Sequence, residues 1–386
     1  MRLHILQTLT LVTFFCISCK EPPKSESVVV KAEKPVVKEV KNYSNRFNDI
    51  AGILSGTNEE FNKLNYLYDS LPWKENKSLI DSNWRKLENN RLKLMVNWSK
   101  KELDAANENG HAVFYPFSGP DFLTSNAFFP KAKEAIMLGL EPVGALPDIS
   151  TFSSEEAMDY CKDFKRSLTE IFEKSYFVTA YMLKDFQKQK VNGLLPVMCF
   201  FVKKTGHQIA DVKYLVKYNN DSIVQVAYDT KEKPFGVKII YLKDDTMKTI
   251  YYFKYDVSNK QFNDTNVFYK FINDHTKNSV TYIKSASYLL HANFMSNIRN
   301  LILTNSNYVM QDDTGIPYNY FADASKWNVK LYGEYVRPIK NFPYLKMQKG
   351  IMEAYAKDSS SVPKLPFHLG YHWQEKKDAL IYASKK

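Results

Sequence analysis

The chain has 386 residues, 44% of them hydrophobic and 25% charged, as in ordinary globular proteins, and aromatic residues are abundant at 15%. The formal net charge is +11, of which +8 falls on residues 43–386. The lysines are scattered among Asp and Glu without a block of like charge. This pattern argues against a dedicated nucleic-acid groove and favours a solvated surface that tolerates anionic polymers or lipid headgroups.

The amino terminus resembles a bacterial lipoprotein signal. A short apolar stretch, Leu3 to Ser18, follows Arg2 and ends at Cys19, after which the chain becomes polar. A membrane-spanning helix needs about 20 mostly apolar residues, so this shorter, Thr-containing stretch predicts a signal peptide over residues 1–19. The lipidation pattern has an aliphatic residue three positions before the cysteine, and Cys16 in that place is a departure from it.

Cys19 is therefore the expected site of lipid attachment. Acyl chains contribute about 0.8 kcal/mol per buried methylene, so two or three chains on Cys19 would hold the protein on a membrane. We expect an outer-membrane lipoprotein that faces the periplasm or the surface, and Lys20-Glu21 resembles a surface-export signal. The alternative is an ordinary secretory signal with two incidental cysteines.

The rest of the chain divides into a tether and a folded part. The tether consists mainly of Lys, Glu, Pro, Ser and Val and has no aromatic residue. It cannot bury enough apolar surface to fold alone, so it is expected to be disordered. Helical spacing of Phe47, Ile50 and Ile53, and a second stretch over Ser78–Leu103, predict that the folded part begins with helices. The predicted organisation is a tether over 20–42 and a single large α+β domain over 43–386, helical over 43–110 and mixed over 111–386.

Two segments of the mixed part combine proline, glycine and aromatic residues: Ala112–Pro130 and Gly139–Asp148. Proline removes a backbone donor and disfavours helical angles in the residue before it, so short strands or extended segments are expected there. Ser153 and Glu156 then form a capping box at the start of a helix.

From Leu195 the apolar period becomes two, which predicts strands that short links join into an antiparallel β-meander. The expected strands are Leu195–Lys204, Ile209–Tyr218, Ser222–Asp229, Gly236–Lys243 and Met247–Tyr255. Later elements are helices near Phe262–Asp274 and Ser285–Leu303, a strand over Tyr308–Gln311 and a turn over Asp312–Gly315. The predicted fold class is α+β, with N-terminal helices and an antiparallel meander packed with helices.

Asp313-Thr314-Gly315 matches the tripeptide of aspartic proteases, in which two carboxylates share a proton. That chemistry needs a second copy of the tripeptide, and the chain has none. A turn in which Asp side chains bond the local backbone is the preferred interpretation.

A carboxylate–histidine group is the alternative site. His291 falls on the apolar stripe of the helix expected over Ser285–Leu303, where a histidine is more often a core residue than a catalyst. It precedes Asp312 and Asp313 by about 20 positions, and Asp121 stands in a rigid Gly-Pro-Asp turn. If these side chains converged, they could perform acid–base chemistry.

Motifs for metals and cofactors are lacking in the sequence. His368 and His372 are four apart, but no Glu or Cys completes a metal set. A phosphate-binding loop, a Gly-x-Ser-x-Gly elbow and a dinucleotide fingerprint are also missing, so no cofactor and no metal are expected. Cys161, on a helix stripe, and Cys199, on the strand expected around Leu195–Lys204, are expected to be buried free thiols, with a disulfide between them as the alternative.

Three segments, YPFSGPDF (115–122), GLEPVG (139–144) and QDDTGIPY (311–318), are similar to a group of uncharacterised bacterial envelope lipoproteins. The resemblance covers most of the chain after residue 110. It implies a lipoprotein with one specialised domain, and it carries over no functional residue.

The sequence thus favours a lipid-anchored envelope protein with a non-catalytic binding or structural role, whose partner is a polysaccharide or a protein. Exposed Tyr and Trp could stack on sugar rings. The alternatives are an envelope hydrolase that acts on polysaccharide or cell wall through Asp121, His291, Asp312 and Asp313, and a subunit of an export or motility complex.

Overall fold

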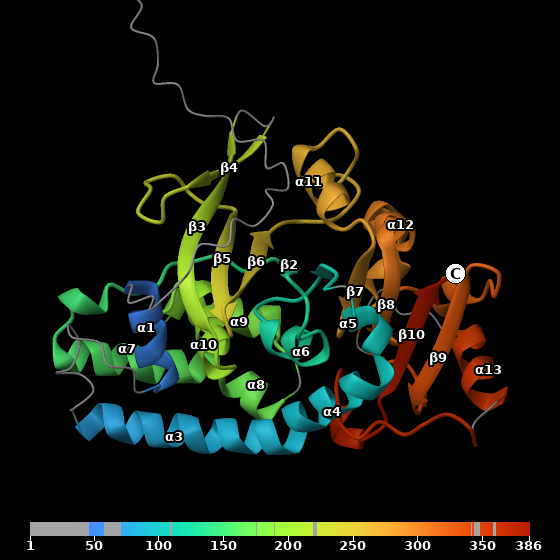
Figure 1. The fold of residues 1–386 in the computed structure, drawn as a ribbon, viewed down its shortest axis with the longest axis horizontal. Helices are drawn as coiled ribbons and strands as arrows, with labels where there is room; N and C mark the ends of the chain where they lie inside the picture. The colour runs from blue at the N-terminus through green and yellow to red at the C-terminus, as the bar shows by residue number, and fades with distance from the viewer. Residues whose placement is uncertain are drawn as a thin grey trace, which may run out of the picture.

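The computed structural model describes residues 46–57, 71–108, 110–174, 176–188, 190–218, 222–340, 342, 348–357 and 360–386. The signal peptide, Cys19 and the tether lie outside the described residues. The fold is α+β, as predicted. Within the described residues the strands form a ten-stranded sheet in the order β4-β3-β5-β6-β2-β1-β7-β8-β10-β9. Figure 1 shows β3, β5 and β6 in one half of the molecule and β8, β10 and β9 in the other.

The two ends of the sheet are antiparallel and its centre is parallel. β3 pairs with β4 and β5, and β5 with β6, all antiparallel, as expected for these strands. The predicted meander is nevertheless incomplete, because β5 lies beside β3 and not beside β4, the strand that precedes it in the chain. The neighbours β6, β2, β1, β7 and β8 are parallel to one another, and β10 pairs antiparallel with β8 and β9. The strands span β1 Val113–Tyr115, β2 Glu134–Gly139, β3 Gln208–Tyr218, β4 Ser222–Val226, β5 Gly236–Lys243, β6 Thr246–Lys254, β7 Ser279–Ile283, β8 Ser306–Asp312, β9 Trp327–Gly333 and β10 Ala379–Lys385.

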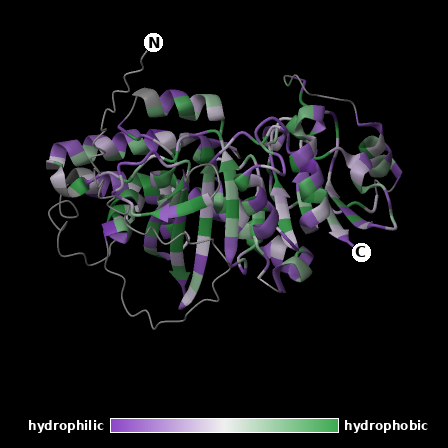
Figure 2. Ribbon diagram, turned by 90° about the horizontal axis from the view of Figure 1, so that it is seen from above, coloured by the Kyte–Doolittle hydropathy of each residue, from purple (hydrophilic) through white to green (hydrophobic). Residues whose placement is uncertain are grey.

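Helices cover both faces of the sheet. On β6, Tyr252 packs in the core that contains α1, α4, α6, α7 and α10, whereas Tyr251 and Phe253 pack in the core that contains α11 and α12. The strands in the middle of Figure 2 are accordingly rich in hydrophobic residues. The α-helices span α1 Arg46–Ser55, α3 Leu71–Leu87, α4 Lys93–Glu102, α5 Asp104–Glu108, α6 Phe122–Phe128, α7 Ser154–Ser167, α8 Thr169–Glu173, α9 Thr179–Lys188, α10 Leu195–Lys204, α11 Val267–His275, α12 Ser296–Asn305 and α13 Lys349–Lys357.

The strand predicted over Leu195–Lys204 is wrong, because these residues form helix α10. Every residue from Leu195 to Lys203 is buried, so the run is apolar all round, and such a run does not distinguish a buried helix from a buried strand. Pro196, near the helix start, was a signal for a helix N-terminus. Cys199 therefore lies on a helix.

The helix predicted over Ser78–Leu103 exists and is longer, and it runs along the lower edge of the molecule in Figure 1. A π-helical turn, Glu88–Leu92, separates α3 from α4. The extra residue of such a turn rotates the helix face, so that Leu87, Leu92 and Met95 all stay buried despite the five-residue step between the first two.

One further prediction was fully correct, and two were correct in part. The capping box of Ser153 and Glu156 is present at the start of α7. The helix expected over Ser285–Leu303 begins only at Ser296, after two short 3₁₀ turns, Leu289–His291 and Asn293–Met295. The segment Ala112–Pro130 contains the short helix α6 in addition to strand β1.

Candidate functional site

The loops after the parallel strands meet at one edge of the sheet. From β1 the chain passes to β2 on one side, whereas β7 and β8 lie on the other side. The sheet therefore reverses its strand order between β1 and β7, and ligands of open α/β sheets bind beyond the carboxyl ends of the strands at such a point. Asp121 follows β1, Lys284 directly follows β7, and Asp312 ends β8.

Asp121 is 1% exposed and caps α6 through the Thr124 amide, 3.1 Å from Oδ1. Its Oδ2 lies 2.5 Å from Lys284 Nζ, and it also accepts hydrogen bonds from Tyr115 Oη at 3.1 Å and Thr124 Oγ1 at 2.6 Å. The Lys284 side chain is 2% exposed. Asp121 therefore joins the start of α6 to the residue that follows β7, and protein donors surround its carboxylate.

Asp312 is a buried turn residue. Its Oδ1 accepts from the Thr314 amide at 3.0 Å and from Thr314 Oγ1 at 2.5 Å, while Oδ2 accepts from the Ser285 amide at 2.7 Å. The predicted turn with Asp-to-backbone bonds is confirmed. Burial raises the pKa of Asp312, although these donors and the charge of Lys284 oppose the rise.

Asp313 differs in having one side-chain partner in the described structure, Tyr288, whose hydroxyl donates to Oδ2 at 2.8 Å. Burial and the neighbouring Asp312 raise the pKa of Asp313 to about 7. A carboxyl with this pKa is a possible acid or base at neutral pH, but the residue is 6% exposed.

The loop after β7 has an unusual backbone. Ser285, Ser287 and Tyr288 all have positive φ angles, between 53° and 58°. Such conformations are costly for residues other than glycine and persist where the surroundings impose them. Tyr371 provides one constraint, because its hydroxyl donates to the Ser285 carbonyl at 2.8 Å and lies 2.7 Å from Ser287 Oγ.

The two histidines near the carboxyl end have separate partners. His368 Nδ1 lies 2.7 Å from Asp378 Oδ2, and burial raises the pKa of Asp378 to about 6 although His368 opposes the rise. His372 Nε2 lies 2.8 Å from the Arg337 carbonyl. Among the described residues no group of three His, Cys, Asp or Glu is arranged to hold a metal ion.

His291 lies in the 3₁₀ turn Leu289–His291, and its ring contacts the Tyr288 ring edge-on, with centroids 5.4 Å apart. Tyr288 thus touches both His291 and Asp313. Asp121 and Asp312 are instead linked through Lys284, which pairs with Asp121 and whose charge opposes the rise in the pKa of Asp312. The four sequence candidates therefore fall into two groups, Asp121 with Asp312 around Lys284, and Asp313 with His291 around Tyr288.

His291 also borders an open pocket of about 370 Å³. The pocket lies between the 3₁₀ turns before α12, the 3₁₀ turn Tyr318–Phe321 and the start of α13. Among the described residues, its lining combines aromatic, amide and basic side chains without a carboxylate: His291, Asn293, Arg299, Pro317, Tyr318, Asn319, Tyr320, Gln348, Lys349 and Gly350. We call it the Tyr320 pocket.

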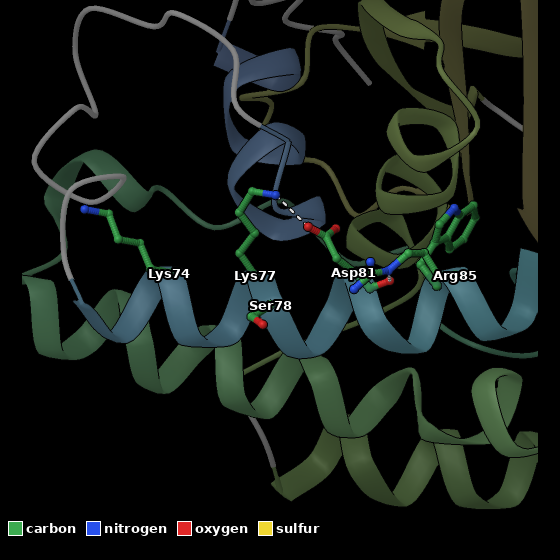
Figure 3. Close-up of a pocket in the computed structure, with 6 residues that line it drawn as sticks. Lys74, Lys77, Ser78, Asp81 and Arg85 are labelled. Carbon is green, nitrogen blue, oxygen red and sulfur yellow. Dashed lines mark hydrogen bonds and ion pairs between the residues drawn. The ribbon is translucent and has the colours of Figure 1, made fainter.

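A second pocket, of about 420 Å³, lies on α3 and is drawn in Figure 3. Basic side chains line this pocket, among them Lys77. Asp81 partly neutralises their charge, because its Oδ2 lies 2.6 Å from Lys77 Nζ and its Oδ1 lies 2.5 Å from Lys204 Nζ. Partial burial opposes ionisation of Asp81, but the two lysines outweigh it and lower its pKa. The α3 pocket is therefore an ion-paired helix surface.

Sequence reasoning did not find Lys284, Arg299 or Tyr320. Strand β7 was not predicted, although Ser279–Ile283 has the β-branched and aromatic residues of a buried strand, and a lysine directly after it was the available signal.

Cys161 and Cys199 are buried free thiols, in agreement with the preferred prediction. None of the helices among the described residues has the length and hydrophobicity that a membrane span requires.

Comparisons with protein families, curated proteins and solved structures yielded no match to this chain.

Proposed function

We propose that this protein is a lipid-anchored component of the bacterial cell envelope that binds an envelope polysaccharide without catalysing a reaction on it. The attachment and the outer-membrane location are inferred from the leader, Cys19 and the tether of the sequence. The folded part then serves as a binding module held at the membrane.

The observation that carries the binding role is the chemistry of the Tyr320 pocket. Tyr320 is 38% exposed, and Asn293 and Asn319 are also exposed. An accessible ring offers a stacking face for a sugar, and amides donate to and accept from hydroxyl groups. The pocket has this combination without a carboxylate in its described lining, which favours binding over acid–base chemistry.

An envelope hydrolase is the second candidate, and the observation in its favour is the pKa of about 7 at Asp313. Against it stands the burial of Asp121, Asp312 and Asp313, since a general acid or base must come within hydrogen-bond distance of the substrate. The release of reducing ends from the bound polysaccharide, abolished by Asp313→Asn, would favour this candidate.

Attachment is tested by comparing two cysteine variants of the full chain. Cys19→Ser is expected to abolish incorporation of a labelled fatty acid and to move the protein from the membrane to the soluble envelope fraction. Cys16→Ser is the matched control and should keep both properties. Labelling that survives Cys19→Ser would refute the assignment of the anchor.

Binding is tested by cosedimentation with polysaccharide fractions of the producing cell envelope. Tyr320→Ala is expected to reduce retention at least tenfold, because the lost stacking and the lost burial of the ring together cost about 1.4 kcal/mol or more. Tyr181→Ala is the matched control, since Tyr181 is 56% exposed and does not line the pocket. Failure of the parent protein to bind any fraction would remove the proposed function.

A further inference from the structure

We infer that the ligand of the Tyr320 pocket carries an oxyanion, so that the polysaccharide is an acidic one, substituted with carboxylate or phosphate. This inference rests on the proposed function and specifies its ligand class. Three features of the pocket favour such a ligand: a buried arginine, the start of a helix, and the contact between the arginine and the exposed ring.

The first feature is Arg299, which is 6% exposed although it lines the pocket. Its Nη1 donates to the Leu290 carbonyl at 2.6 Å and to the Ala292 carbonyl at 3.2 Å. Among the described residues, the buried Arg299 Nε has no hydrogen-bond acceptor. A buried charge is unfavourable unless it is paired, so this guanidinium favours an anion in the pocket.

The second feature is the start of α13. Lys349 and Gly350, the first two residues of this nine-residue helix, both line the pocket. The first-turn amides of a helix carry a partial positive charge and are available to an anion. The Lys349 side chain is exposed and adds a full positive charge beside them.

The third feature is the contact between the Arg299 guanidinium and the Tyr320 ring. The Arg299 guanidinium lies 4.9 Å from the centroid of the Tyr320 ring. A ligand that stacks on Tyr320 is therefore brought close to the buried cation. A sugar with an acidic substituent matches both groups, whereas an inorganic anion would use the cation alone.

Gln348 is not available to the ligand in the same way. Its Oε1 accepts from the Tyr318 amide at 3.0 Å, and its Nε2 donates to the Asp313 carbonyl at 2.9 Å. Gln348 therefore fixes the pocket wall against the Asp313 turn, and specificity rests on the basic groups, the ring and the exposed asparagines.

The test uses the polysaccharide fraction that the full-length protein retains, in four forms: untreated, carboxyl-reduced, dephosphorylated, and treated in both ways. We expect the doubly treated form to bind at least tenfold more weakly than the untreated one, and the single treatments to show which oxyanion is responsible. Equal binding of all four forms would overturn the inference while leaving polysaccharide binding intact. Retention of no fraction would instead refute the proposed function.

Two lysines of α13 give a matched pair of variants. Lys349→Glu reverses the charge at the pocket, and Lys357→Glu makes the same change at the exposed far end of the helix. We expect at least a tenfold loss of binding for the first and less than a twofold change for the second. Both variants must give the parent circular dichroism spectrum, and equal effects on binding would contradict the inference.

Two further probes test whether inorganic phosphate or an anionic lipid is the ligand of the pocket. Inorganic phosphate at millimolar concentration should compete only weakly, because it does not use the Tyr320 ring. For vesicles of phosphatidylcholine with one-third phosphatidylglycerol, we expect Lys349→Glu to leave the binding of the protein to the vesicles unchanged. Binding to those vesicles that Lys349→Glu abolishes, together with no binding of the polysaccharide, would replace the inference with a lipid-binding surface.

Discussion

Lys284 Nζ and Asp121 Oδ2 are 2.5 Å apart in the interior, and this ion pair ties the end of β7 to the loop that follows β1. The two strands are neighbours at the centre of the sheet, where the strand order reverses. The ion pair thus occupies the position where an open α/β sheet would bind a ligand, and fills it with protein groups.

We expect the pair to be strongly coupled in stability. Removing one partner leaves the other charge buried, which costs about 3 to 5 kcal/mol, so Asp121→Asn and Lys284→Met should each lower the free energy of unfolding by that order. The double variant should lose less than the sum of the two. Urea denaturation of the three proteins measures this.

The half-exposed pair of Lys77 and Asp81 provides the control, because Lys77→Met should cost no more than about 1 kcal/mol. Additive losses at Lys284 and Asp121 would show that the two charges do not stabilise each other.

Asp313 should make stability depend on pH. Its pKa is about 7 in the folded protein against an ordinary 3.8, so folding takes up protons between these values and the free energy of unfolding falls as pH rises through them. Asp313→Asn should therefore stabilise the protein at pH 8 by roughly 2 to 4 kcal/mol, since one pKa unit corresponds to about 1.4 kcal/mol. Near pH 4.5 the variant and the parent should be similar.

Unfolding measured at both pH values checks this prediction. Burial also raises the pKa of Asp378, to about 6, so part of the pH dependence should remain in the variant. A stability difference that is the same at both pH values would contradict the protonation of Asp313 in the folded state.

Much of the fold followed from pattern, and the errors have physical causes. Strand β5 and the turn at Asp312 were predicted at their observed positions, because alternation and Asp-rich turn chemistry are local signals. Helix α10 was not, because a run buried on all sides has no polar face to reveal its period. Lys284 could not be paired with Asp121 from sequence, because 163 residues separate them and the pairing depends on strand order.

Gly144, the last residue of the segment GLEPVG, lies in close backbone contact with Gly193. A Cβ on Gly193 would lie 2.5 Å from the Cα and the amide nitrogen of Gly144. We expect Gly193→Ala to destabilise the protein by several kcal/mol, because backbone atoms must move. Gly350→Ala, where the nearest atom would lie at 3.4 Å, is the control and should change the melting temperature little.

Neither folded-part cysteine should react in the native protein. Burial raises the pKa of Cys161 to about 12 and raises that of Cys199 further, so thiolate is scarce at both. Iodoacetamide at pH 8, followed by peptide mapping, should label neither residue before denaturation and both after it. A peptide that joins Cys161 to Cys199 would contradict the structure.

We propose that the Tyr320 pocket binds polysaccharide and that the buried carboxylates stabilise the fold. The most direct measurement is the dissociation constant for the retained envelope polysaccharide, compared between Tyr320→Ala and Asp313→Asn. We predict at least a tenfold increase for Tyr320→Ala and no change for Asp313→Asn. Unchanged binding with Tyr320→Ala, and loss with a folded Asp313→Asn, would contradict it.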